Sequence, residues 1–96
     1  MQQFESWYDH ASHIPLAMHH MAPHEQLYGI TALILEPGSF VQQLRVTNPE
    51  EETFMFLKLA DLYNLRADLT GTLSDRNQAA DCMHRFRELL VDFFGY

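Results

Sequence analysis

Hydrophobic and polar residues separate most cleanly in the last part of the chain, over residues 74–94. Apolar residues recur there at spacings of 4, 3, 4 and 3, which is the period of one face of an α-helix. Ser74 is a favoured N-cap, and the carboxylate of Asp75 suits the positive end of the helix dipole. We therefore predict a helix over residues 74–94 whose buried face carries Ala79, Met83, Phe86, Leu90 and Phe93.

A second helix is predicted directly after Asn48 by three independent signals. Asn48 is a favoured N-cap, Pro49 suits the first helical position, and the glutamates at 50–52 suit the first turn. The helix is predicted over residues 49–68, and Gly71 is typical of the residue that ends a helix. The short connection that follows predicts an antiparallel hairpin with the final helix.

The predicted helix over residues 49–68 is apolar around most of its circumference. Its polar residues form one narrow stripe, made of Lys58, Asp61, Asn64 and Asp68. A helix with so little polar surface has to be covered on more than one side. The final helix can supply one cover, and the N-terminal half of the chain, or a second chain, has to supply the other.

Residues 27–47 fit two different structures. The sequence Glu36-Pro37-Gly38-Ser39 is typical of a turn, because proline presets φ and glycine supplies a positive φ. The side chains that follow alternate as in a strand, with one face made of Phe40, Leu44 and Val46. This combination favours a β-hairpin over residues 27–47. The alternative is a pair of short helices, because one helical face would also collect Leu27, Ile30 and Ile34.

The N-terminal segment is predicted to hold a short helix over residues 2–12, one side of which carries Phe4, Trp7, Tyr8 and Ala11. Pro15 and Pro23 limit the residues between them to a short helix or an irregular turn. The chain is then a single α+β domain over residues 1–96, with a short N-terminal helix, the β-hairpin and the helical hairpin. If residues 27–47 are helical instead, the domain is a small all-α fold.

Composition and charge narrow the classes of partner. The chain has 96 residues, of which 13 are acidic and 6 are basic, so the formal net charge is −7. Binding to phosphate backbones or to anionic membrane surfaces requires clustered Lys and Arg, so we expect neither nucleic acid nor a membrane as partner. A protein partner with a basic surface would be attracted.

The sequence also predicts the compartment. The single cysteine, Cys82, excludes an internal disulfide. The first residues lack the basic and apolar regions of a signal peptide, and no apolar run approaches the ~20 residues of a membrane span. We therefore expect a soluble cytoplasmic protein.

Five of the six histidines fall within fifteen residues, and such a cluster could form a metal site. His10 and His13 are three residues apart and would share a helix face. Pro15 and Pro23 interrupt the helix that would align further ligands, and the spacing matches no standard zinc pattern. We predict no metal and no other cofactor, and we keep a metal-binding domain as an alternative, with the weak candidates His10, His13, His20 and His24.

No arrangement typical of catalysis is present in the sequence. Cys82 and His84 are two residues apart in a helical pattern and therefore face different directions. No serine lies in a nucleophile elbow, and the four glycines are scattered rather than gathered in a phosphate-binding loop. We predict that the protein is not an enzyme.

Aromatic residues near both ends of the chain and an acidic helix start are typical of a surface that binds a protein. We expect an interaction module, either a regulator, an adaptor or an inhibitor, that docks on a larger protein partner. The alternatives are a structural homodimer and a subunit of a larger complex. The predicted partner-binding residues are Trp7, Tyr8, Glu50, Glu51, Glu52, Phe93, Phe94 and Tyr96.

Overall fold

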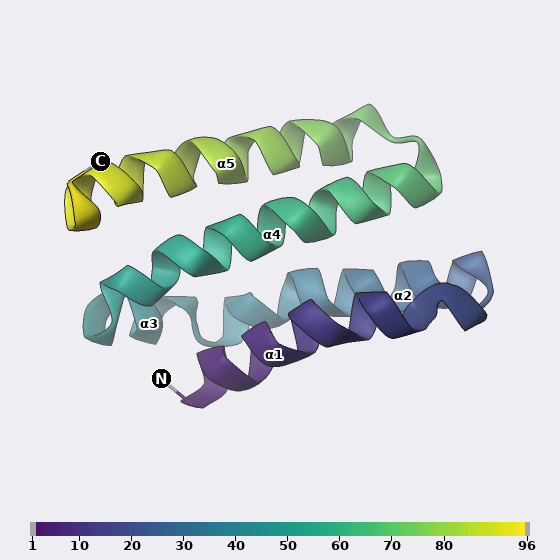
Figure 1. The fold of residues 1–96 in the computed structure, drawn as a ribbon, viewed down its shortest axis with the longest axis horizontal. Coiled ribbons are helices and arrows are strands. Elements are labelled where there is room, and N and C mark those ends of the chain that lie inside the picture. The colour runs from purple at the N-terminus through teal and green to yellow at the C-terminus, as the bar shows by residue number, and fades with distance from the viewer. Residues whose placement is uncertain (1, 96) are drawn as a thin grey trace.

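The computed structural model describes residues 2–95, and the regular elements in that range are all helices. Five α-helices follow one another (Figure 1): α1 (Gln2–Ala17), α2 (Pro23–Leu35), α3 (Val41–Thr47), α4 (Pro49–Thr70) and α5 (Leu73–Phe94). Two 3-10 turns come after α1 and α2, at Met18–His20 and Glu36–Ser39. The described chain is an all-α fold with extents of 40 × 28 × 19 Å. Within it, no helix combines the length and the apolar character needed to cross a membrane.

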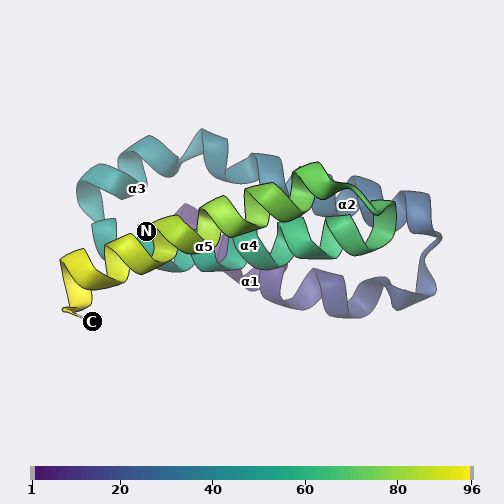
Figure 2. The same ribbon diagram turned by 90° about the horizontal axis from the view of Figure 1, so that it is seen from above.

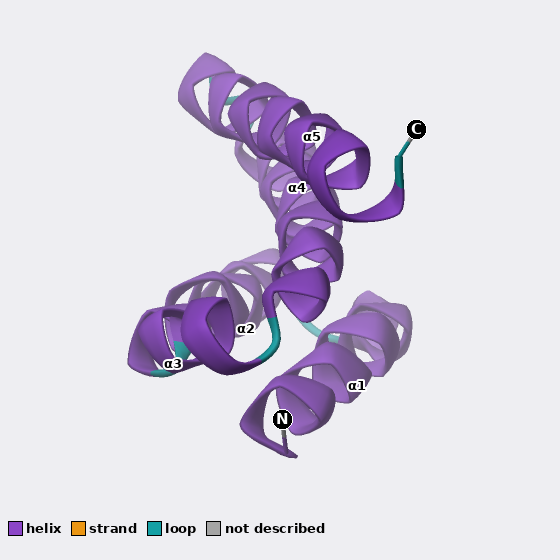
Figure 3. Ribbon diagram, turned by 90° about the vertical axis from the view of Figure 1, so that its left-hand side faces the viewer, coloured by secondary structure: helices purple, strands orange, loops and turns teal. Residues whose placement is uncertain are grey.

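Helix α4 lies in the middle of the molecule. Figure 3 shows α5 on one side of it, and α1 together with α2 and α3 on the other. Figure 2 shows α5 running along α4. The buried residues of α4 occupy about half of its circumference, and they are Glu52, Thr53, Met55, Leu59, Ala60, Leu62 and Ala67. The prediction that this helix is covered on more than one side is confirmed, and both covers come from the same chain.

Helix α4 begins and ends close to the predicted positions. Asn48 precedes it and Pro49 is its first residue. Gly71 ends the helix in the left-handed conformation, with φ of 73°, which glycine adopts without strain. The N–H of Gly71 donates to the carbonyl oxygen of Ala67 at 2.7 Å.

The prediction that Ser74 caps α5 is wrong. The helix begins at Leu73, and Thr72 stands in the N-cap position. The link between α4 and α5 is short, and its own residues form hydrogen bonds with one another. The hydroxyls of Thr70 and Thr72 are 2.5 Å apart, and the Thr72 N–H donates to Thr70 Oγ1 at 3.3 Å. Because the chain turns within so few residues, Ser74 falls in the first turn of α5 rather than before it.

The prediction of a β-hairpin over residues 27–47 is also wrong, because α2, a 3-10 turn and α3 occupy this segment. Burial there follows a helical period. Phe40 and Leu44, four residues apart, are buried, whereas Val46, expected on the same strand face, is 82% exposed. Gly38 lacks the positive φ expected of the turn. The alternative interpretation, two short helices, agrees with the structure.

Helices are the more stable choice for this segment because each one satisfies its own backbone hydrogen bonds. A two-stranded hairpin leaves both strand edges open and is only marginally stable without further strands. Helix α2 instead buries Ile30, Leu33 and Ile34 at helical spacing.

Helix α1 is longer than the predicted segment, which ends at residue 12. It continues through Pro15 to Ala17. Pro15 has no N–H to donate to the carbonyl oxygen of Ala11, so the last turn lacks one helical hydrogen bond, and the α-helix ends two residues later. Pro23 is the first residue of α2, a position that suits proline.

Trp7 lies at the centre of the layer that α1, α2 and α3 form on one side of α4. Its side chain is completely buried, and its indole N–H donates to the carbonyl oxygen of Leu33 at 2.8 Å. The ring centroids of Phe4 and Phe40 lie 6.2 and 6.1 Å from that of Trp7. Trp7 therefore joins α1 to α2 and to the residue that precedes α3.

The buried face of α5 is rotated from the predicted one. Ala79 is buried as predicted, but Phe93 is 43% exposed. Three more residues of the predicted face are only partly buried, namely Met83, Phe86 and Leu90. The other buried residues of α5 are Asp75, Cys82 and Leu89. Because α5 has α4 as its main neighbour, only a narrow stripe is covered, and residues at its edges stay partly in water.

The hydroxyl of Thr53 is buried and has no hydrogen-bond partner among the described residues. Leaving such a group unpaired is unfavourable by about 1–3 kcal/mol. We predict that Thr53→Val, which keeps the shape, raises the free energy of unfolding by about 1 kcal/mol, measured by urea denaturation. Thr31→Val is the matched control, because the Thr31 hydroxyl accepts from Arg66 Nη1 at 3.3 Å and its removal should lower stability. A Thr53→Val protein less stable than the parent would contradict this account.

Candidate functional site

Three phenylalanine rings lie exposed where the start of α4 meets the end of α5. Phe54, Phe93 and Phe94 are 40%, 43% and 41% exposed. The ring centroids of Phe54 and Phe94 are 6.0 Å apart at an interplanar angle of 66°, an edge-to-face arrangement. Figure 1 shows the start of α4 and the end of α5 at the same end of the molecule. We call Phe54, Phe93 and Phe94 the aromatic patch.

Phe54 belongs to a single exposed line along α4. Between residues 50 and 68, the exposed side chains are those of Glu50, Phe54, Asp61 and Asp68. Their spacings of 4, 7 and 7 place them on one side of the helix. Three of the four are carboxylates, so Phe54 is the one apolar side chain on the part of this stretch that the neighbouring helices leave open.

The structure divides the predicted partner-binding residues between the surface and the interior. The exposed ones are Glu50, Phe93 and Phe94, and the half-buried ones are Tyr8 and Glu51. Trp7 and Glu52 are buried, at 0% and 2% exposure, so a partner cannot reach either without opening the fold. Tyr96 lies outside the described residues.

Glu52 is buried because it forms an ion pair with Arg45 of α3, whose Nε donates to the Glu52 Oε2. The pairing depends on the path of α3, which the sequence predicted as a strand. The local run of three glutamates therefore could not separate Glu52 from its exposed neighbour Glu50.

Phe54 is the site residue that the sequence interpretation missed. The signal was present, because on a helical wheel Phe54 falls in line with Glu50, Asp61 and Asp68. Its position among many apolar residues made it look like part of the core. Which line of α4 stays open depends on where α1 and α5 pack, and that is a property of the tertiary structure.

The histidines do not converge on a common site. His13 Nδ1 is 2.8 Å from the carbonyl oxygen of Asp9 and 3.2 Å from its Oδ1. The other candidates are exposed, namely His10, His20 and His24. Within residues 2–95, no group of three or more His, Cys, Asp or Glu side chains is placed to hold a metal ion. The metal-binding alternative therefore has no ligand set in this part of the chain.

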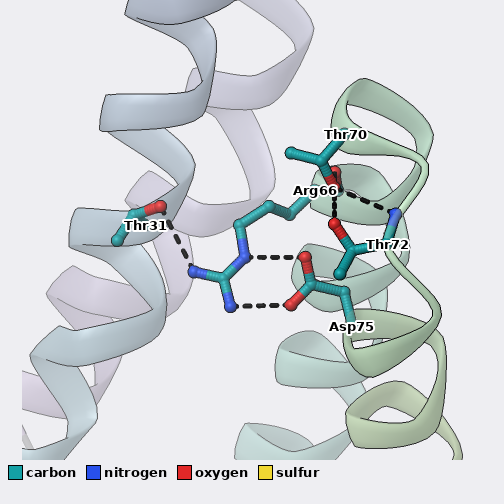
Figure 4. A network of polar contacts seen from close by, with 5 residues as sticks. All are labelled: Thr31, Arg66, Thr70, Thr72 and Asp75. Atoms are coloured by element: carbon teal, nitrogen blue, oxygen red, sulfur yellow. Dashed lines mark hydrogen bonds and ion pairs between the residues drawn. The ribbon is translucent and has the colours of Figure 1, made fainter.

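The densest polar cluster joins α2, α4 and α5 (Figure 4). Arg66 Nε and Nη2 donate to the two carboxylate oxygens of Asp75 at 3.0 and 2.7 Å, and Nη1 donates to Thr31 Oγ1 at 3.3 Å. The hydrogen bond to Asp75 raises the pKa of Arg66, so the guanidinium stays charged. Because the guanidinium is engaged on both sides, this cluster holds three helices together rather than offering a reactive group.

Burial also explains why two weakly acidic side chains, those of Cys82 and Tyr63, have raised pKa values. It raises the pKa of Cys82 to about 11, and the nearby charge of Asp81 adds to the shift. Burial raises the pKa of Tyr63 as well, with a further contribution from Cys82. A thiol with so high a pKa is protonated at neutral pH and is a poor nucleophile.

The described surface has two depressions of a size that suits a small ligand. One, of about 500 Å³, lies beside the start of α1 and is lined mainly by amide and hydroxyl side chains. The other, of about 140 Å³, lies between α1, α2 and α4 and is mostly apolar. The groups with shifted pKa values, Tyr63, Arg66 and Cys82, line neither of them. The titratable side chains that line them are Glu36 in the first depression, and His19 and Asp68 in the second.

We predict that Arg66→Met lowers the free energy of unfolding by about 3 kcal/mol, because it leaves the buried Asp75 carboxylate without its partner. Arg76 offers a matched control, since it pairs with Asp68 at the surface, where the two side chains are 49% and 61% exposed. Arg76→Met should therefore lower the free energy of unfolding by less than about 1 kcal/mol. Urea denaturation of both variants measures the difference, and equal losses would refute the structural role of Arg66.

The pKa of Cys82 predicts a loss of stability in alkali. The pKa of the Cys82 thiol is about 11 in the folded protein, against an ordinary value of 9.0. Unfolding at a pH between these two values therefore releases a proton from the thiol. The contribution to stability is complete below pH 9 and is lost as the pH rises to 11. The stability advantage of the parent over Cys82→Ala, measured in urea, should shrink across this range. An advantage that does not change with pH would speak against burial of the thiol.

Comparisons with known proteins assign the chain to no family. No protein-family model, no curated protein and no solved structure matches the chain. Its function has to be inferred from its own surface, where the aromatic patch brings three exposed rings to one end of the molecule.

Proposed function

We propose that the protein is a small acidic interaction module, either a regulator, an adaptor or an inhibitor, that docks on a larger protein through the aromatic patch and the carboxylates beside it. The observation that carries the proposal is the exposed pair of Phe54 and Phe94, whose rings meet edge to face at the surface. Aromatic side chains of this kind are enriched at the energetic centres of protein interfaces.

The aromatic patch is held in place before any partner arrives. Phe54 is on α4 and Phe94 is on α5, the two longest helices, which pack along each other. Rigid anchors lose little conformational entropy when a partner docks, so more of the contact energy appears as affinity. Val91, one turn before Phe94 and 58% exposed, extends the apolar surface.

The charge around the aromatic patch favours a basic partner surface. Glu50 lies one turn before Phe54, and Asp61 lies two turns after it on the same side of α4. Four of the six basic residues are engaged in ion pairs inside the molecule or along its helices, namely Arg45, Arg66, Arg76 and Arg85. The remaining surface is therefore dominated by carboxylates, which attract a positively charged partner.

The proposed activity is binding, without catalysis. The main polar cluster, around Arg66, is used to hold helices together. Cys82 is the only cysteine and is buried. The fold thus depends on no disulfide, which suits a reducing compartment such as the cytoplasm.

Site-specific photo-crosslinking tests the proposal. A benzophenone amino acid in place of Phe54 should give a discrete adduct with a larger protein in the cell of origin. The same amino acid in place of Leu73, which is 72% exposed at the other end of α5, should give at most a tenth of that adduct. Phe94→Ala should reduce the adduct at position 54 about tenfold or more, with an unchanged circular dichroism spectrum.

Two outcomes count against the proposal. Equal labelling from positions 54 and 73, or no adduct from position 54, would mean that the aromatic patch is not an interface. An adduct with the mass of two copies of the chain would mean that the aromatic patch binds a second copy, as in the homodimer alternative, and not a larger partner.

A further inference from the structure

The aromatic patch by itself is too small to be a whole interface. Its three rings are 40–43% exposed, which corresponds to roughly 60–100 Å² for each ring. A specific protein interface covers about 800 Å² on each partner. The patch is therefore only the centre of the contact, and most of the partner has to lie on neighbouring surface.

The exposed line of α4 is the surface that continues from the patch. Helix α1 borders it on one side, where Lys58 Nζ lies 5.0 Å from the centroid of the Tyr8 ring. Helix α5 borders it on the other, where Arg76 Nη1 donates to Asn64 Oδ1 at 3.1 Å. Figure 3 looks along α4 with α5 above it and α1 below. We call the exposed line between these two borders the α4 strip, and its members are Phe54, Asp61 and Asp68.

The spacing of the α4 strip suits a helix. Its three members follow one another at intervals of seven residues, or about 10.5 Å along the helix axis. A partner helix that lies along α4 repeats its own side chains at the same interval, so it can set one side chain opposite each member. The whole strip is about 21 Å long, which is the length of about 14 helical residues.

The charge of the α4 strip determines which side chains the partner helix needs. Asp61 and also Glu50, which lies one turn before the strip, make no ion pair within residues 2–95, whereas Asp68 is already paired with Arg76. Covering an unpaired carboxylate is unfavourable unless a cation meets it. The partner therefore has to bring Lys or Arg toward Asp61 and Glu50, and an apolar side chain toward the aromatic patch.

A second copy of the chain does not have this chemistry. A twofold contact uses the same surface on both copies, so it brings two acidic strips together and supplies no cation for either of them. Each copy also carries a net charge of −7, so self-association through this surface is opposed by electrostatic repulsion. A basic partner turns the same carboxylates into an attractive surface.

We infer that the α4 strip binds one amphipathic basic helix of the partner, an inference that rests on the proposed function. An apolar side chain of that helix covers Phe54 and Phe94, and a Lys or Arg two turns further along faces Asp61. The sides of the helix contact α1 and α5, which supplies the area that the patch lacks.

The test uses two synthetic peptides and nuclear magnetic resonance. One is an amphipathic helix of about 18 residues with a leucine face flanked by lysines, and the other has every lysine replaced by glutamate. The lysine peptide should shift the backbone resonances of the α4 strip and of the last turn of α5, and its binding should weaken as salt is added. The glutamate peptide should leave these resonances unchanged.

Matched variants locate the contact. Asp61→Asn should weaken binding of the lysine peptide about three- to fivefold, and Phe94→Ala should weaken it about tenfold or more. Asp81→Asn removes the same charge from an exposed position of α5 that does not border the strip, and it should leave the affinity unchanged. Equal effects of Asp61→Asn and Asp81→Asn, shifts on another face, or no binding of the lysine peptide would overturn the inference.

The peptide and crosslinking results separate the two proposals. If position 54 crosslinks to a larger protein but the lysine peptide does not bind, the interaction module stands and the basic helix is wrong. If neither result is obtained, both proposals are wrong.

Discussion

The rest of the fold depends on covering α4, a helix that is apolar around most of its circumference. Each large apolar side chain that is fully buried stabilises a fold by about 1.5–3 kcal/mol, and α4 buries Met55, Leu59 and Leu62. One neighbour cannot shield a helix of this kind. The chain therefore places α5 on one side and α1, α2 and α3 on the other, and the layered shape of the molecule follows from this requirement.

The same constraint explains where the buried charges are. Two charged side chains on the covered sides of α4 are paired with side chains of the covering helices. Glu52 meets Arg45 of α3, and Arg66 meets Asp75 of α5. These pairs avoid the large free-energy penalty of an isolated buried charge, and they attach α4 to its neighbours in a definite register.

Covering α4 on two sides leaves one line of it in water, and this line connects the fold to its proposed function. A line of carboxylates alone would be an ordinary solvated face. Phe54 in that line, paired with Phe94 of α5, gives it an apolar centre with acidic surroundings. That combination matches a helix with an apolar face and basic flanks, and it opposes a second acidic chain.

Local caps, periodicity and composition were enough to predict the helical hairpin after Asn48, the need to cover α4 and the acidic character of the surface. They did not predict that residues 27–47 are helical, that Trp7 and Glu52 are buried, or that Phe54 is exposed. These features depend on which distant segment packs against each residue. The bond from Trp7 to the carbonyl of Leu33, 26 residues away, is a contact of this kind, and no local pattern contains it.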